Sequence, residues 1–222
     1  MAFAWSYSAY KEFDQCARKY HLIKIEKKYK PDQNAPALVY GRKLHKEIEN
    51  YLLHGEPLGE IASPYEKHVT RLKNVTGQLI VEKKMGLTKA FEPCDFFGKN
   101  VWWRGAPDIL ILDEDKGVAR VLDWKTNKNA NYADPDQLEL MAMAIFSYYP
   151  KIHTVKGVLL FLKVDEAVPK TFTRGQLNDI KSKWMGRVGR ITKAIDTDVW
   201  NPTQGPLCKF CPVSNKDCEY AP

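Results

Sequence analysis

The sequence predicts an α/β fold with a mixed central sheet flanked by helices, helices at the N-terminal end and a Cys-rich tail at the C-terminal end. Two observations predict it. The middle of the chain follows the order strand, strand, strand, helix, strand, and helical patterns lie on either side. Of the 222 residues, 44% are apolar and 27% are charged, which is typical of a globular protein large enough to bury a core.

Apolar residues at helical spacing predict helices at 6–24, 37–53, 65–75, 135–149 and 174–195. A Pro-rich break at 30–36 separates the first two, and Asp134-Pro135 is a typical start for the fourth. Shorter runs of strand-forming residues predict strands at 79–87, 101–112, 118–126 and 155–164. We expect a single domain of residues 1–222, with a helical part at 1–75, an α/β core at 76–165 and a basic helix with a Cys-rich metal-binding tail at 166–222.

Charge and hydropathy narrow the class of function. The 34 basic and 27 acidic residues leave a net charge of +7, which weakly favours a polyanionic partner such as nucleic acid. No run of apolar residues is long enough to span a membrane, and the first residues do not resemble a secretion signal. We therefore expect a cytoplasmic protein without a membrane partner.

Two acidic residues lie on neighbouring strands of a predicted hairpin. If residues 114–117 form its loop, Asp113 opposes Val118, and the same register places Asp108 opposite Asp123. Directly opposed carboxylates repel each other, but a divalent cation such as Mg²⁺ binds carboxylate oxygens and turns the repulsion into ligation. The hairpin therefore predicts a metal site at these two residues.

Lys125 lies two residues after Asp123, so both side chains point to the same face of the strand. An ammonium group beside metal-binding carboxylates can orient a water or stabilise charge on a phosphoryl oxygen. Glu82, on an upstream strand, is a candidate third acid. Taken alone, Asp123 and Lys125 also fit a surface ion pair; the opposed Asp108 favours the site.

The series Gly105-Ala-Pro-Asp108, Asp123-Trp-Lys125 and Gln137 resembles the PD-(D/E)XK nuclease superfamily. More narrowly, it is similar to RecB-type nucleases, including CRISPR-adaptation exonucleases and helicase-linked recombination nucleases. The resemblance implies a restriction-endonuclease-like core and hydrolysis of DNA. It also implies Mg²⁺ or Mn²⁺ on Asp108 and Asp123, a lysine (Lys125) that assists the attacking water, and a helical glutamine (Gln137) that contacts the DNA end region. The family often has Tyr four residues after the glutamine, where this chain has Met141.

His45 lies on an amphipathic helix, where a histidine by itself is more often a packed or surface residue. The RecB-like family, however, has a G-x-x-x-H helix whose histidine completes the metal shell, and Gly41 to His45 matches that spacing. The resemblance therefore implies that His45 is a metal ligand.

Three of the five cysteines, Cys208, Cys211 and Cys218, lie in the last fifteen residues. Closed zinc and iron–sulfur sites need four ligands, and Cys16 is the candidate fourth. Free thiols are the alternative, although the tail has little apolar periodicity to order it otherwise. The spacing does not choose between zinc and iron–sulfur. The family implies a [4Fe–4S] cluster that links the two ends of the chain, and Cys94 is left without a role.

Together with these residues, the resemblance implies a metal-dependent DNA exonuclease with a structural iron–sulfur cluster. It would act in recombination, repair or phage DNA processing in a bacterial, archaeal or phage-infected cell, and its partners would include a recombination protein, a single-strand-annealing protein or a helicase. Two alternatives remain open. One is a non-enzymatic nucleic-acid-binding module stabilised by zinc or an iron–sulfur cluster, and the other is a structure-specific endonuclease.

Overall fold

The computed structural model describes residues 4–222, apart from the side chain of Tyr132. The chain divides into two compact units. The central unit comprises residues 34–181, and the terminal unit combines residues 4–33 with Ser182–Pro222. The catalytic candidates all lie in the central unit, and the four candidate cluster cysteines all lie in the terminal unit.

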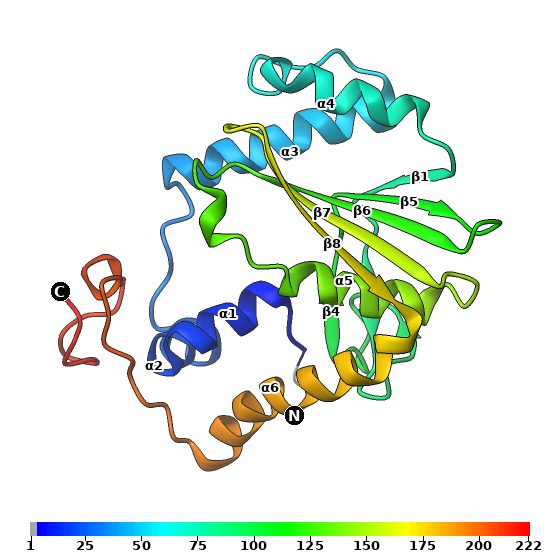
Figure 1. Cartoon of the computed structure of the whole chain (residues 1–222). Helices are drawn as coiled ribbons and strands as arrows, with labels where there is room; N and C mark the ends of the chain where they lie inside the picture. Colours follow the sequence, from blue (N-terminus) through cyan, green and yellow to red (C-terminus); the bar gives the residue numbers. More distant parts are fainter. Residues whose placement is uncertain (1–3) are drawn as a thin grey trace. The chain divides into compact units, whose positions relative to one another are not determined.

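A five-stranded mixed sheet forms the centre of the central unit, in the order β1-β5-β6-β7-β8 (Figure 1). The parallel pair is β6 with β7, because helix α5 connects them, and the other neighbours are antiparallel. The strand bounds are Gln78–Val81 for β1, Ile109–Asp113 for β5, Val118–Lys125 for β6, Thr154–Phe161 for β7 and Glu166–Thr173 for β8.

Helices cover both faces of this sheet (Figure 1). Helix α3 (Pro36–His54) and helix α4 (Glu66–Thr70) lie on one face, and α5 (Asp136–Tyr148) lies on the other. Short 3-10 turns, Ser63–Tyr65 and Arg71–Asn74, flank α4. On the α3 face, alternate residues of β1, β5, β6 and β7 pack into a core, as a pleated sheet requires. This core includes Leu44, Ile48, Val69, Ile109, Ile111 and Trp124.

A second, three-stranded sheet in the order β3-β2-β4 belongs to the same unit. Its strands are Met85–Leu87 (β2), Pro93–Cys94 (β3) and Trp103–Gly105 (β4). The Tyr148 hydroxyl of α5 contacts the backbone of Gly86 and Cys94, each at 3.0 Å. These hydrogen bonds attach the small sheet to α5.

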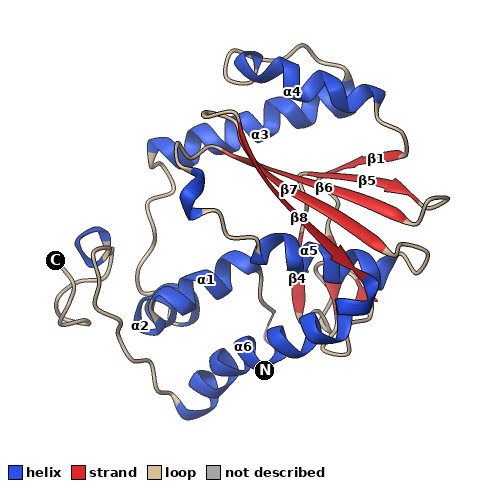
Figure 2. Ribbon diagram, in the orientation of Figure 1, coloured by secondary structure: helices blue, strands red, loops and turns tan. Residues whose placement is uncertain are grey.

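The terminal unit packs around aromatic side chains. It contains α1 (Tyr7–Gln15), α2 (Ala17–Tyr20), a π-helical turn at His21–Ile25, the greater part of α6 (Leu177–Thr197) and a 3-10 turn at Cys208–Phe210 (Figure 2). The rings of Trp5 and Trp184 stack at 5.5 Å, and Tyr10 meets Trp184 edge-on. Two further 3-10 turns, Ala130–Tyr132 and Arg174–Gln176, precede α5 and α6 in the central unit.

The predicted fold class is confirmed, and several of its elements differ from the prediction. The strands predicted at 79–87 and 101–112 are each divided in two, because Glu82 has a left-handed backbone and residues 106–108 leave the sheet. The helix predicted at 6–24 is broken at Cys16, whose extended backbone ends α1 and whose Sγ accepts a hydrogen bond from Lys19 N at the start of α2. Strand β8 was not predicted; most of its residues are exposed.

Among the helices of residues 4–222, none combines the length and the apolar character that crossing a bilayer requires.

Candidate functional site

The predicted hairpin has the register that places the two acids opposite each other. Asp113 pairs with Val118 and Ile109 with Leu122. Asp108 and Asp123 are the next residues beyond the last pair, with Asp108 just outside β5. Gly117 closes the loop with a left-handed backbone, φ +63°, which glycine adopts without strain. Asp108 and Asp123 are 8% and 6% exposed, so the hairpin buries both carboxylates.

Asp108 lies directly before β5 and is held from two sides. Its Oδ2 accepts a hydrogen bond from the backbone N–H of Trp124 at 2.7 Å. Its Oδ1 lies 3.2 Å from Nδ1 of His45, which helix α3 presents to the end of the sheet. The Trp124 contact could not be predicted from residue types, because it comes from the backbone of the opposite strand.

Asp123 and Lys125 lie on one face of β6, and Gln137 of α5 links them. Lys125 Nζ donates to Gln137 Oε1 at 2.6 Å, and Gln137 Nε2 donates to Asp123 Oδ1 at 2.5 Å. Lys125 Nζ also lies 2.6 Å from Asp123 Oδ2 as an ion pair. That contact lacks hydrogen-bond geometry, so Oδ2 is a buried oxygen without a hydrogen-bond partner among the described residues.

Glu82 joins the site because the strand predicted at 79–87 is interrupted there. Its left-handed backbone follows β1, and its N–H donates to the carbonyl oxygen of Asp108 at 3.0 Å. One ligand atom each from His45, Glu82 and Asp108 lies within 4.8 Å of the others. The structure therefore brings together all six residues predicted for this site. His45, Glu82 and Asp108 form one group of contacts. Asp123, Lys125 and Gln137 form the other.

The crowded acids change one another's ionisation. Burial and the negative charge of Asp108 raise the pKa of Asp123 to about 6, against the opposing effects of Lys125 and His45. Burial and the same Asp108 charge raise the pKa of Glu82 to about 7. Burial lowers the pKa of His45, but the hydrogen bond and charge of Asp108, with the charges of Asp123 and Glu82, outweigh it and raise that pKa overall.

This donor set fits a hard divalent cation. Carboxylate oxygens and one imidazole are ligands that Mg²⁺ and Mn²⁺ accept. Burial and, after it, repulsion by Asp108 raise the pKa values of two acids, and a bound cation would relieve the repulsion. Asp123 Oδ2 is buried and has no hydrogen-bond partner among the described residues.

The cysteines predicted to form a cluster line one cavity in the terminal unit. Cys16, Cys208, Cys211 and Cys218 all border a space of about 190 Å³. Thr203 lies beside two of them, since its N–H contacts Cys16 Sγ at 3.5 Å and its carbonyl oxygen contacts Cys208 Sγ at 3.8 Å. All four are free thiols, a donor set that fits zinc or iron–sulfur. Cys94 is a half-buried residue of β3 in the central unit.

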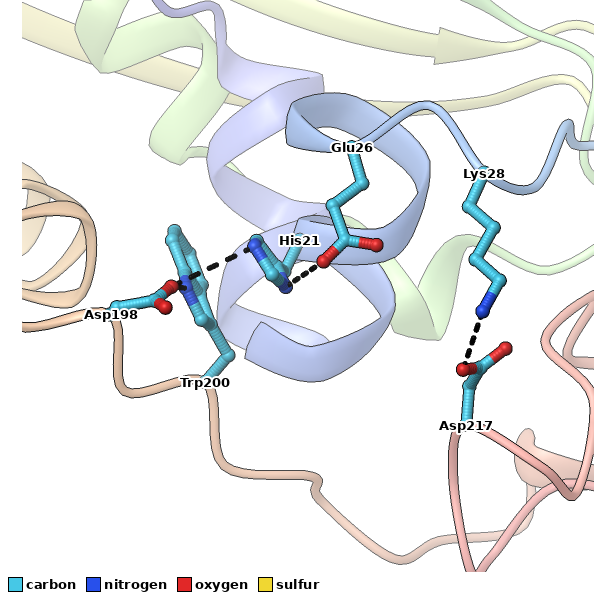
Figure 3. Close-up of polar contacts among 6 residues, drawn as sticks. All are labelled: His21, Glu26, Lys28, Asp198, Trp200 and Asp217. Carbon is cyan, nitrogen blue, oxygen red and sulfur yellow. Dashed lines mark hydrogen bonds and ion pairs between the residues drawn. The ribbon is translucent and has the colours of Figure 1, made fainter.

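Polar contacts also hold the Cys-rich tail, although its sequence has little apolar periodicity. Asp217 accepts from Lys28 Nζ at 2.6 Å (Figure 3) and from the Tyr29 hydroxyl, which also contacts Ser214 at 2.8 Å. Val213 is buried. Closer to α6, the His21 ring stacks on Trp200 at 4.5 Å and faces Glu26 and Asp198 (Figure 3).

Three tryptophans near β4 and on α6 are structural. Trp102 and Trp103 are 9% and 0% exposed, and Trp184 of α6 is fully buried. Arg187 of the basic helix lies over the Trp184 and Tyr10 rings, and Arg190 pairs with Asp14 at 2.5 Å. These side chains of α6 therefore stabilise the terminal unit.

Comparisons with known proteins give one matching family and two similar folds. The family model for the PD-(D/E)XK nuclease superfamily matches residues 4–216. Two solved structures have a similar fold: a protein from Eubacterium rectale named "putative exonuclease", and SSO0001. The first is 17% identical to this chain with a TM-score of 0.55, and the match covers 96% of this chain and 91% of that protein. The second is 15% identical with a TM-score of 0.50, and the match covers 95% of this chain and 84% of that protein. Among curated proteins, none matches this chain.

Proposed function

The chain belongs to the PD-(D/E)XK nuclease superfamily, and we propose that it is a Mg²⁺- or Mn²⁺-dependent DNA exonuclease of the RecB type. The observation that carries this proposal is the buried Asp108–Asp123 pair, bordered by His45 and Glu82 on one side and by Lys125 on the other. The fold shared with the Eubacterium rectale protein is consistent with it.

Asp108, Asp123, Glu82 and His45 would hold the divalent ion. When bound, such an ion stabilises negative charge on a phosphoryl oxygen and acidifies a water. His45 and Asp108 now share a close contact, so His45 must act as the neutral imidazole to offer a lone pair. Glu82, with a pKa near 7, must release its proton before it binds a cation.

Lys125 would contribute a fixed positive charge beside the scissile phosphate. Gln137 and Asp123 hold its ammonium group from two directions, so little reorganisation is needed when charge develops in the transition state. Gln137 thereby acts as a positioning residue, because it orients both Asp123 and Lys125. We propose that Gln137 also contacts the DNA end region, as the family resemblance implies.

In the terminal unit, Cys16, Cys208, Cys211 and Cys218 would hold a [4Fe–4S] cluster. The cavity they line is several times the roughly 30 Å³ share of a water molecule. Four thiolates suit both zinc and iron–sulfur, and the family resemblance favours the cluster.

A recombination protein, a single-strand-annealing protein or a helicase would supply the DNA ends. Free, clustered thiols suit a reducing compartment, which supports a cytoplasmic location.

The test is digestion of linear DNA labelled at either end, next to a closed circular DNA of the same sequence, with Mg²⁺, Mn²⁺ or EDTA. We expect release of nucleotides from linear DNA with either metal, none with EDTA, and an intact circle. Cleavage of the circular DNA would show that the enzyme is an endonuclease. DNA binding without any cleavage would show that the protein is a non-enzymatic DNA-binding module.

A further inference from the structure

A turn on the small sheet presents two aromatic rings side by side. Phe96 and Phe97 lie between β3 and β4, with ring centroids 4.9 Å apart and planes at 78°. Phe97 is 71% exposed, in contrast to the buried tryptophans at the start of β4. The turn is fixed by Asp95, which accepts hydrogen bonds from Phe97 N at 3.0 Å and Gly98 N at 2.9 Å. The rings are therefore presented by an ordered backbone.

Each of these rings has a cation over it. Lys84 Nζ lies 5.5 Å from the centre of the Phe97 ring, and the Arg104 guanidinium lies 5.7 Å from that of Phe96. We call Lys84, Phe96, Phe97 and Arg104 the aromatic platform. The segment 83–104 that contains it has five basic residues against two acidic ones, Glu92 and Asp95. The surface therefore combines π-faces with positive charge.

The aromatic platform is joined to the catalytic acids by both strands that carry it. Lys84 follows Glu82 by two residues, and Arg104 precedes Asp108 by four. An extended chain covers at most about 3.6 Å per residue, so the Cα atoms lie within roughly 7 Å and 14 Å of those acids. Tyr148 fixes the same sheet to α5, the helix that carries Gln137. The platform therefore keeps its position relative to the site.

We propose that the aromatic platform binds unpaired DNA next to the catalytic site, with a base stacked on Phe97 and phosphates against Lys84 and Arg104. Stacking on an aromatic ring needs a base that is not enclosed in a duplex, whereas cations along the path attract any DNA backbone. This inference deepens the proposed function: it names single-stranded DNA, or a frayed end, as the form that the nuclease engages.

The experiment measures fluorescence anisotropy of a labelled oligothymidine, and of a blunt duplex of equal length, in EDTA, so that binding is measured without cleavage. Phe97→Ala should weaken binding of the single strand at least about fivefold, from the usual contribution of one stacked base, and leave duplex binding unchanged. Phe97→Trp should retain wild-type affinity, and Phe97→Leu should not. Lys84→Ala should weaken both DNAs and reduce the salt dependence of binding.

Phe210→Ala is the matched control, because Phe210 is 72% exposed and also has a lysine, Lys209, 5.0 Å from its ring centre. It should bind both DNAs as the wild type does. Wild-type affinity of Phe97→Ala for the single strand, or an equal loss on the duplex, would overturn the proposal. A wild-type protein that shows the stacking effect but cleaves no DNA would refute the nuclease function alone.

Discussion

At the scale of single residues, the site is a set of acids whose charges conflict. Asp108, Asp123 and Glu82 are brought together with one histidine and one lysine, and burial keeps water from screening them. The residue types and the Asp108–Asp123 pairing could be predicted from the sequence. The contacts of Asp108 with Trp124 N and of Gln137 with Lys125 could not, because they depend on the backbone and on how α5 packs.

In metal-free protein, Glu82→Gln tests whether the ionised Glu82 carboxylate destabilises the fold. The pKa of Glu82 is raised in the folded state, so its ionisation destabilises the fold as pH rises from its ordinary value of 4.5 through about 7. In EDTA, the variant should therefore match the wild type near pH 5 and be more stable than it near pH 8. Urea unfolding at both pH values gives the difference. A difference that does not change with pH would contradict this account of Glu82.

Gln137→Ala tests positioning. Without Gln137, the Lys125 ammonium loses its hydrogen bond and Asp123 loses a donor, so kcat should fall about 10- to 100-fold. Loss of the proposed DNA contact should also raise KM. Lys125→Ala should abolish cleavage. Steady-state kinetics checks both, with the exposed Gln78→Ala as control. A loss confined to KM would limit Gln137 to DNA binding.

At the scale of secondary-structure elements, the hairpin was predictable because its loop length and glycine determine its register. The interruptions were not. Glu82 leaves the strand through a left-handed backbone, and Cys16 breaks a helix whose apolar spacing continues past it. Both interruptions occur at residues of the candidate sites, where local structure departs from the sequence pattern. Strand β8 escaped prediction because an exposed edge strand needs few apolar residues.

The glycine of the G-x-x-x-H helix gives a prediction at this scale. A Cβ at Gly41 would meet only Thr126 Oγ1, at 3.6 Å, so Gly41→Ala should keep the fold and stabilise α3 by up to about 1 kcal/mol. If DNA passes close to this helix, activity should fall all the same.

Gly77→Ala is the contrasting variant, because its backbone has φ +114° and a Cβ would lie 2.5 Å from Leu112 O. It should lower the free energy of unfolding. Denaturant unfolding and cleavage rates separate the two variants. A destabilised Gly41→Ala protein would mean that the glycine serves helix packing.

At the scale of the whole molecule, residues from both ends of the chain form the terminal unit, and the Cys-lined cavity lies between them. The sequence indicated that the ends meet, from the count and placement of the cysteines. It did not indicate that Asp217, Lys28 and Tyr29 also bind the tail.

Replacing any of Cys16, Cys208, Cys211 or Cys218 by Ala in anaerobically purified protein should remove the brown colour of an iron–sulfur cluster. It should also lower stability by about 2–3 kcal/mol or more, because a tightly bound group stabilises only the folded state. Cys94→Ala should be nearly silent, and Asp217→Asn should keep the colour. Absorbance spectra and thermal unfolding check this. If the wild-type protein is colourless and contains one equivalent of zinc, the site binds zinc and not an iron–sulfur cluster. If it is metal-free and the cysteine variants are equally stable, there is no metal site.

The central claim is that the buried Asp108–Asp123 pair makes this chain a metal-dependent nuclease. The measurement that tests it most directly is the initial rate of nucleotide release from end-labelled linear DNA in Mn²⁺, for the wild type and for Asp123→Asn. We predict release by the wild type and a loss of at least about a hundredfold in the variant, because a bound metal contributes several kcal/mol to the transition state. Release by Asp123→Asn at the wild-type rate would contradict the claim.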